Sequence, residues 1–158
     1  MDERATLTDF DWRFNPKLPR QACFELHTLK FITQGSNALI IGKPGTGKSH
    51  VAKALAYQGT LQGYDVRYVE ADSTFAQFSL ASPDEQSKRL KDLLEPDLLV
   101  LDEPSAGLDI QARELVWSLV RDQLKAGCAI LLASHDFQEI DALAHSAVVL
   151  KDGRVVAR

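Results

Sequence analysis

Positions 42–49 match the pattern GxxxxGK[ST], which is typical of loops that bind nucleotide phosphates. An apolar run precedes the segment and a helical pattern follows it, which is the setting that this motif requires. The glycines permit backbone conformations in which successive N–H groups point at phosphate oxygens, and the positive end of the next helix adds to the attraction. The segment therefore predicts a site for a nucleoside triphosphate. The residues expected to form it are Gly42, Lys43, Pro44, Gly45, Thr46, Gly47, Lys48, Ser49 and His50.

Four polar side chains could supply charge and metal binding at this site. Lys48 would reach the β- and γ-phosphates and take part in catalysis, and the Ser49 hydroxyl would bind Mg²⁺. Asp102 and Glu103 end the apolar run 98–101. A carboxylate at a strand end can hold Mg²⁺, while an adjacent acid can orient or deprotonate an attacking water. We therefore expect Ser49 and Asp102 to be metal ligands and Glu103 to be catalytic.

His135 directly follows a second apolar run, 129–133, and should therefore emerge at the same edge of the sheet. There it could donate a hydrogen bond to a γ-phosphate. A lone histidine in a loop is more often structural, so the residue alone leaves both interpretations open. The nucleobase is not specified either, because Trp12 and Phe14 could stack on adenine or could anchor the core.

The elements that must position these side chains alternate between strands and helices. The patterns predict the following order: helix 21–33, strand 38–41, helix 48–61, strand 66–69, helix 84–94, strand 98–101, helix 111–125, strand 129–133, helix 136–144, and a hairpin of 147–151 and 154–157 around Asp152-Gly153. This order implies an α/β fold in which helical layers cover a mostly parallel sheet. We expect one P-loop NTPase domain over 1–158, a three-layer sandwich of the ASCE or RecA-like class with a C-terminal hairpin.

Composition excludes several other classes of protein. The 158 residues carry a net charge of −4, with 45% hydrophobic and 25% charged residues, as in an ordinary globular domain. The two cysteines form no CxxC pair, and no histidine is spaced to complete a zinc site. No apolar run approaches the ~20 residues of a membrane span, and the start MDER does not look like a signal peptide. We expect a cytoplasmic protein without membrane insertion.

Over about residues 7–102 the chain resembles the IstB/DnaC-like helper ATPases of insertion-sequence transposition. The resemblance is carried by 10–19 (FDWRFNPKLP), by 29–35, by the phosphate loop with the SHVA that follows, and by 63–66 (GYDV). It implies ATP as the nucleotide, and DNA or a transposase as partner. Charge gives that partner no support, because segment 1–30 holds five Lys or Arg and five Asp or Glu.

Over about residues 98–158 the chain resembles the second half of ATP-binding-cassette (ABC) ATPases. The resemblance rests on 101–109 (LDEPSAGLD), 133–136 (ASHD) and 149–155 (VLKDGRV). It implies that Glu103 is the catalytic base, that His135 contacts the γ-phosphate, and that the protein forms a homodimer. The signature LSGGQ is missing, since 80–86 reads LASPDEQ, and the interval is too short for the helical subdomain and its glutamine loop. These departures put the cassette dimer in doubt.

The two resemblances meet on strand 98–102. This suggests an engineered hybrid with an IstB-like part over about 1–102 and an ABC-like part over about 103–158. A naturally fused or divergent protein is the alternative. The leading functional hypothesis is a protein that binds Mg·ATP and hydrolyses it weakly. The alternatives are a transposition or replication helper that binds DNA or a protein, and an ABC transporter ATPase subunit without its signature. Arg89 and Arg113 are weak candidates for an arginine finger.

Overall fold

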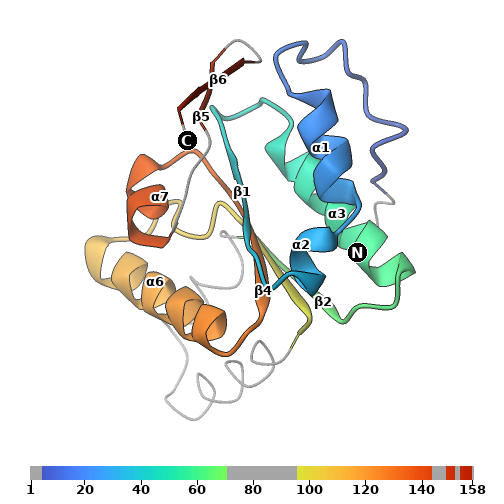
Figure 1. Cartoon of the computed structure of the whole chain (residues 1–158). Helices are drawn as coiled ribbons and strands as arrows, with labels where there is room; N and C mark the ends of the chain where they lie inside the picture. Colours follow the sequence, from blue (N-terminus) through green and yellow to red (C-terminus); the bar gives the residue numbers. More distant parts are fainter. Residues whose placement is uncertain (1–4, 71–95, 144–148, 152–153, 158) are drawn as a thin grey trace.

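A computed structural model describes residues 5–70, 96–143, 149–151 and 154–157. Its helices and strands alternate much as the sequence predicts (Figure 1). In chain order they are α1 (Arg20–His27), α2 (Lys30–Thr33), β1 (Ala38–Ile41), α3 (Lys48–Leu61), β2 (Val66–Glu70), β3 (Leu98–Asp102), α6 (Ile110–Lys125), β4 (Ala129–Ser134), α7 (Phe137–Leu143), β5 (Val149–Lys151) and β6 (Arg154–Ala157). The predicted helix 84–94, the segment 80–86, Arg89 and the hairpin turn 152–153 lie outside the described residues.

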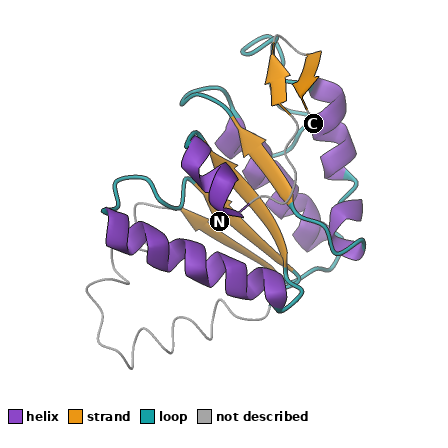
Figure 2. Ribbon diagram, turned by 60° about the vertical axis from the view of Figure 1, so that its left-hand side comes forward, coloured by secondary structure: helices purple, strands orange, loops and turns teal. Residues whose placement is uncertain are grey.

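Four parallel strands form the central sheet in the order β1-β4-β3-β2. Strand β4 therefore lies between β1, which leads into the phosphate loop, and β3, which ends in the two acids. Because all four strands run the same way, their carboxyl ends meet at one edge of the sheet (Figure 2). The expected α/β P-loop NTPase fold is confirmed, and β5 and β6 form the predicted antiparallel pair as a separate sheet.

Helices cover both faces of the sheet. Helices α1, α2 and α3 lie on one side, and α6 and α7 lie on the other (Figure 1). Strand β3 shows the resulting alternation, because Leu98 and Val100 belong to the core under α3 while Leu99 and Leu101 belong to the core under α6. Every residue of β3 is buried, which is why its sequence reads as a continuous apolar run.

The single helix predicted over 21–33 is wrong, because the structure divides it into α1 and α2. The helix is interrupted at Leu29, whose φ of +57° is left-handed. Leu29 and Phe31 are both buried, with 1% and 8% of their surface exposed. On one continuous helix, residues two positions apart point about 200° apart around the helix axis. Leu29 and Phe31 would then lie on opposite sides of the helix, and only one of them would face the core. The break lets both side chains enter the core.

The described helices include none that is both long enough and apolar enough to span a membrane. Elements β1, α3 and β6 have the predicted bounds, and the other boundaries that lie between described residues differ from the prediction by at most one residue. Helix α6, for example, begins at Ile110 because the Asp109 carboxylate accepts a hydrogen bond from the Ala112 N–H at 2.8 Å, which caps the helix.

Candidate functional site

The loop 42–49 directly follows β1, and its last two residues, Lys48 and Ser49, already belong to α3, which begins at Lys48. Gly45 and Gly47 have φ values of +74° and +96°, which residues with a side chain rarely adopt, so the backbone path requires glycine at these two positions. The loop is tied to the sheet at its start, where the Gly42 N–H donates to the Ser134 carbonyl at 3.2 Å. Within the loop the Thr46 hydroxyl donates to the Lys43 carbonyl at 2.8 Å.

The segment before α1 packs against the outside of this loop. Asn15 Nδ2 donates to the Thr46 carbonyl at 3.0 Å. The Phe10 ring lies so close to Gly47 that a Cβ on this glycine would lie 3.0 Å from it. Phe10 also contacts the His50 ring at a centroid distance of 5.0 Å. The N-terminal segment therefore supports the conformation of the loop.

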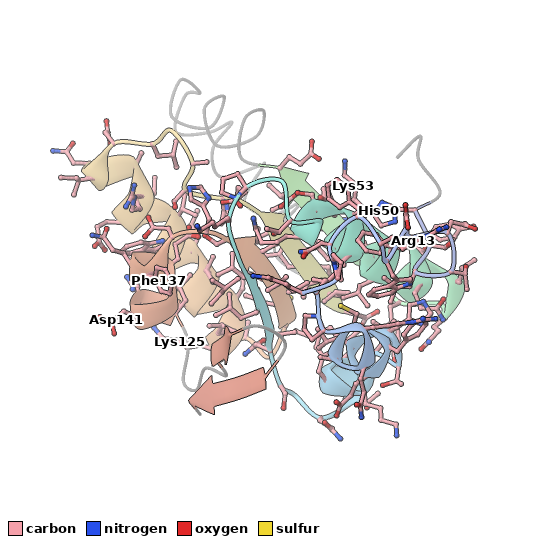
Figure 3. All side chains as sticks on the ribbon, turned by 90° about the horizontal axis from the view of Figure 1, so that it is seen from above. Arg13, His50, Lys53, Lys125, Phe137 and Asp141 are labelled. Atoms are coloured by element: carbon pink, nitrogen blue, oxygen red, sulfur yellow. The ribbon has the colours of Figure 1, made fainter. Side chains whose placement is uncertain are left out.

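His50 was expected to line the nucleotide site, but its contacts lie with the N-terminal segment. Its Nε2 is 3.2 Å from the Thr6 carbonyl, in addition to the ring contact with Phe10. Figure 3 labels His50 on α3 near Arg13 of that segment. Trp12 is likewise engaged, since its ring packs against Phe10 and stacks on Phe24 at 5.6 Å. Phe14, in contrast, is 66% exposed.

Lys48 is buried at the start of α3, with 5% of its surface exposed. Its ammonium lies 3.0 Å from Glu103 Oε1 and donates to the Lys43 carbonyl at 3.2 Å. A buried cation needs such partners, because unpaired burial of a charge is costly. The loop lysine and the acid at the end of β3, predicted from separate motifs, are therefore brought into direct contact.

Glu103 connects Lys48 to His135. Its Oε2 lies 2.6 Å from His135 Nδ1 and accepts a hydrogen bond from the His135 backbone N–H at 3.3 Å. The Glu103 backbone has a left-handed φ of +52°, and its N–H donates to the Ala133 carbonyl at 2.8 Å. The structure thus brings the three predicted catalytic side chains together in one chain of contacts. With Nδ1–H donated to Glu103, His135 could donate Nε2–H to a phosphate only as an imidazolium.

Asp102, the expected metal ligand, is 5% exposed and lies on the face of β3 that packs under α3. Its Oδ2 accepts a hydrogen bond from the Tyr68 hydroxyl at 2.7 Å. Its Oδ1 is buried and has no hydrogen-bond partner. A buried carboxylate oxygen without a partner is costly in free energy, and a bound cation would satisfy it. The residues present therefore fit Mg²⁺.

Ser49, the second expected metal ligand, lies one helical turn before Lys53 on the same face of α3. The Lys53 ammonium lies 5.9 Å from the centre of the Tyr68 ring and 3.0 Å from Glu70 Oε1. The Lys53 side chain therefore reaches β2, the neighbour of β3, while Ser49 itself is exposed. The described residues hold no cluster of three His, Cys, Asp or Glu, so an ion here would need phosphate or water oxygens as further ligands, as Mg²⁺ commonly uses.

Tyr68 is the site residue that sequence reasoning missed. Burial and the hydrogen bond to Asp102 raise the pKa of its hydroxyl well above its ordinary value, and the negative charges of Asp102 and Glu70 act in the same direction. The raised pKa favours the protonated hydroxyl, which donates to Asp102. Nothing in the sequence marks Tyr68 as a site residue. Its contact with Asp102 depends on the pairing of β2 with β3, which the sequence alone does not establish.

Arg113, a weak candidate for an arginine finger, is engaged within its own chain. Its Nη1 lies 2.9 Å from Asp136 Oδ2 and donates to Gln138 Oε1 at 2.9 Å. The guanidinium also lies over the Trp117 ring at 5.9 Å. These contacts connect α6 to the start of α7, directly after His135, and they give Arg113 a role in holding these elements together.

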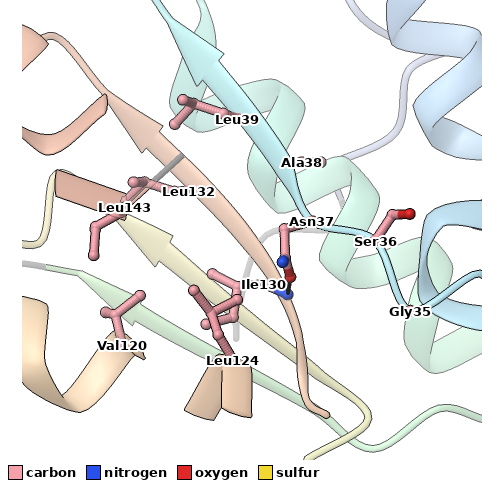
Figure 4. A pocket seen from close by; sticks show the side chains of 10 residues that line it. All are labelled: Gly35, Ser36, Asn37, Ala38, Leu39, Val120, Leu124, Ile130, Leu132 and Leu143. Carbon is pink, nitrogen blue, oxygen red and sulfur yellow. Dashed lines mark hydrogen bonds between the residues drawn. The ribbon is translucent and has the colours of Figure 1, made fainter. Parts of the chain in front are cut away.

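A separate cavity of about 450 Å³ lies at the other end of β1 (Figure 4). Its lining comes from the turn before β1 and from β1, β4, α6 and α7. These residues are Gly35, Ser36, Asn37, Ala38, Leu39, Val120, Leu124, Ile130, Leu132 and Leu143. None of the predicted nucleotide or metal ligands is among them.

Comparison with known proteins assigns the family. The family model described as "IstB-like ATP binding protein" matches residues 1–152. The chain belongs to the IstB-like ATP-binding protein family. A relative of this kind, "Putative ATP-binding protein Rv3427c in insertion sequence" from Mycobacterium tuberculosis, is 28% identical over 142 residues. The match covers 85% of this chain and 54% of the relative, so the chain spans about half the relative's length.

The ABC resemblance is supported over a shorter stretch. The Nod factor export ATP-binding protein I of Burkholderia pseudomallei is 48% identical over 63 residues, which is 40% of this chain and 21% of that protein. The IstB-like family model nevertheless continues through β3 to residue 152, past the strand at which the hybrid hypothesis places a change of family. The comparisons thus give no support to an engineered origin.

Among solved structures, "Replication initiator DnaA bound to AMPPCP and single-stranded DNA" superposes on this IstB-like chain with a TM-score of 0.68 at 23% identity. The superposition covers 91% of this chain and 46% of the other. Identity this low supports the shared fold alone.

Proposed function

We propose that this IstB-like protein binds Mg·ATP at the loop 42–49 and uses the bound nucleotide to control its association with DNA or a protein partner in transposition. The observation that carries the proposal is the buried Lys48 ammonium, which lies at the base of the loop and is paired across the site with Glu103 at 3.0 Å. Family membership over 1–152 supports ATP as the nucleotide.

Nucleotide binding would exchange the partners of Lys48. A triphosphate in the loop would accept hydrogen bonds from the loop N–H groups and from the first turn of α3. Its phosphates would compete with Glu103 for the Lys48 ammonium. Ser49 and Asp102 would hold Mg²⁺, which neutralises phosphate charge when bound. Glu103 would keep His135 as a partner through its other oxygen.

Glu103, once released from Lys48, is placed to act as a general base. It would accept a proton from the water whose oxygen attacks the γ-phosphorus, while the bond from that phosphorus to the bridging oxygen breaks and ADP leaves. An arginine finger can add about 10³ to 10⁵ to the rate of such a reaction. Arg113 is paired with Asp136, so this chain alone supplies no such group from that position, and we propose slow hydrolysis.

The partner proposal rests on the family and on the M. tuberculosis relative, whose name places it in an insertion sequence. The net charge of −4 argues against broad electrostatic attraction to DNA. Any DNA contact would therefore involve a local part of the protein surface. The affinity of the protein for a short DNA duplex should fall steeply as the salt concentration rises. Salt-dependent DNA binding that requires Mg·ATP would support this half of the proposal, and its absence would favour a protein partner.

A second candidate function is that of an ABC-type ATPase, which the 48% identity over 63 residues favours. ABC resemblance implies that two copies enclose the nucleotide, so this candidate predicts a homodimer that forms only with Mg·ATP. Light scattering measures the molar mass with and without Mg·ATP, and it thereby distinguishes the ABC-type candidate from the function proposed first. A monomer under both conditions would exclude the ABC-type assembly.

Calorimetry of the full chain with Mg·ATP tests nucleotide binding directly. Lys48→Ala should weaken binding by at least about 100-fold, because charge-assisted contacts to the phosphates are lost. The matched control is Lys125→Ala, which removes the same charge from the far end of α6, where the side chain is 77% exposed. Wild-type protein that is folded yet shows no affinity for Mg·ATP would overturn the proposal, as would an unchanged affinity in Lys48→Ala.

A further inference from the structure

Asp102 presents two oxygens with different surroundings. Oδ2 accepts a hydrogen bond from the Tyr68 hydroxyl at 2.7 Å, whereas Oδ1 is buried and has no hydrogen-bond partner. A free carboxylate can rotate and exchange its two oxygens. A bond to one of them removes that freedom, so the other oxygen is left in a fixed position.

Sheet register explains why Tyr68 reaches this carboxylate. In the parallel pair β2–β3, Tyr68 is level with Val100 and Glu70 is level with Asp102. Tyr68 and Asp102 lie on the same face of the sheet, two positions apart along the strands. A phenol is long enough to span that offset, and its hydroxyl meets the carboxylate at the carboxyl end of β3.

Tyr68 is itself held by two further contacts. Its ring packs against the core formed under α3. The Lys53 ammonium lies 5.9 Å from the ring centre and is paired with Glu70 at 3.0 Å. These contacts restrict the movement of the ring and hold its hydroxyl beside Asp102.

We propose that Tyr68 is a positioning residue for the metal carboxylate Asp102, because its hydroxyl holds Oδ2 and leaves Oδ1 available to the Mg²⁺ of the bound nucleotide. This inference rests on the proposed nucleotide function and deepens it. Tyr68 touches neither nucleotide nor metal in this role. It acts through Asp102, so its effect should appear only in the part of nucleotide affinity that depends on Mg²⁺.

The test is Tyr68→Phe, measured by calorimetry with ATP in the presence of Mg²⁺ and again in excess EDTA. Loss of a group that orients a metal ligand typically weakens metal affinity by 10- to 100-fold. We therefore expect the gain in ATP affinity on adding Mg²⁺ to fall roughly 10-fold or more, with the affinity in EDTA unchanged. The matched control is Tyr64→Phe, which removes a tyrosine hydroxyl at the edge of the same core and should leave both affinities unchanged.

A double-mutant cycle with Asp102→Asn separates positioning from a merely structural role. If Tyr68 acts through the carboxylate, Tyr68→Phe should have no further effect on the Mg²⁺-dependent gain in the Asp102→Asn background. Thermal unfolding without nucleotide checks that each variant folds.

This design distinguishes failure of the proposed function from failure of the inference about Tyr68. Wild-type protein without any Mg²⁺-dependent gain would overturn the proposed function and this inference with it. A wild-type gain that Tyr68→Phe retains in full would overturn the inference alone, even if Tyr68→Phe melts at a lower temperature. Equal losses in the presence and absence of Asp102 would also overturn it.

Discussion

The phosphate loop and the strand ends beside it are held in place by different kinds of contact. In the loop, the bonds of Gly42 and Asn15 involve backbone groups, and Gly47 is fixed by its backbone angle and by the Phe10 ring. At the strand ends, side chains hold one another. Those contacts are Lys48 with Glu103, Glu103 with His135, and Tyr68 with Asp102.

Because of this difference, substitutions in the two regions should affect different properties of the protein. A change in the loop alters a backbone path, so it should affect folding and nucleotide binding together. A change at a strand end alters one partner in a network of side chains, so it can remove a chemical step while the fold persists. Three substitutions test this division, from the largest expected effect to the smallest.

Glu103→Gln should remove most of the ATP hydrolysis that we propose for this protein. An amide cannot accept the proton of the attacking water, and a positioned general base typically contributes about 10² to 10⁴ in rate. Binding of Mg·ATP should persist, because Lys48 is expected to leave the residue at 103 for the phosphates when the nucleotide binds. Phosphate release measured alongside calorimetry checks both. The control is Glu114→Gln on α6, where the Glu114 side chain is 59% exposed. Undiminished hydrolysis in Glu103→Gln would remove this residue from the role of base.

Gly47→Ala should destabilise the fold and weaken nucleotide binding together. The left-handed φ of +96° is unfavourable for alanine, and the new Cβ would lie 3.0 Å from the Phe10 ring. We expect a loss of about 2 to 3 kcal/mol in the free energy of unfolding. Gly63→Ala has a similar φ of +88° with nothing within 4 Å of the Cβ, so only about 1 to 2 kcal/mol should be lost. Urea unfolding measures both, and equal losses would show that Phe10 does not support the loop.

Asn15→Ala should have the smallest effect, about 1 kcal/mol in unfolding, because it removes one partly buried hydrogen bond to the Thr46 carbonyl. Asn37→Ala removes a comparable bond, from the Ile130 N–H at 2.9 Å, at the opposite end of the sheet. Both variants should therefore lose similar stability, but only Asn15→Ala should lose affinity for Mg·ATP. A similar affinity loss in Asn37→Ala would mean that the loop responds to general stability and not to its own support.

Much of the fold and the loop could be predicted because their signals are local. Gly45 and Gly47 mark two positive φ values along a short stretch, and the apolar run of β3 indicates burial on both faces. The contacts that define the strand ends have no such signal. Tyr68 and Asp102 are 34 positions apart, and Asn15 and Thr46 are 31 apart. Each pair depends on strand register or on docking of a segment, which a single sequence does not specify.

The break at Leu29 shows the same limit inside one element. The run 21–33 contains no glycine or proline that would mark a break, and the left-handed residue is a leucine. Burial of both Leu29 and Phe31 decides the path, and that requirement comes from the core under α3 and not from neighbouring residues.

The strand order has a consequence for how the site is made. Among the described strands, β1 pairs only with β4, and the hydrogen bond that joins Asn37 to Ile130 spans 93 positions. The loop is thus encoded in the first third of the chain, yet its supporting strand gains a neighbour only once most of the polypeptide has been synthesised. Contacts between such distant segments slow folding, because a long stretch of chain must be ordered before they form. A nascent chain that stops before β4 would carry the whole phosphate-binding motif on a strand, β1, that has no neighbour to pair with.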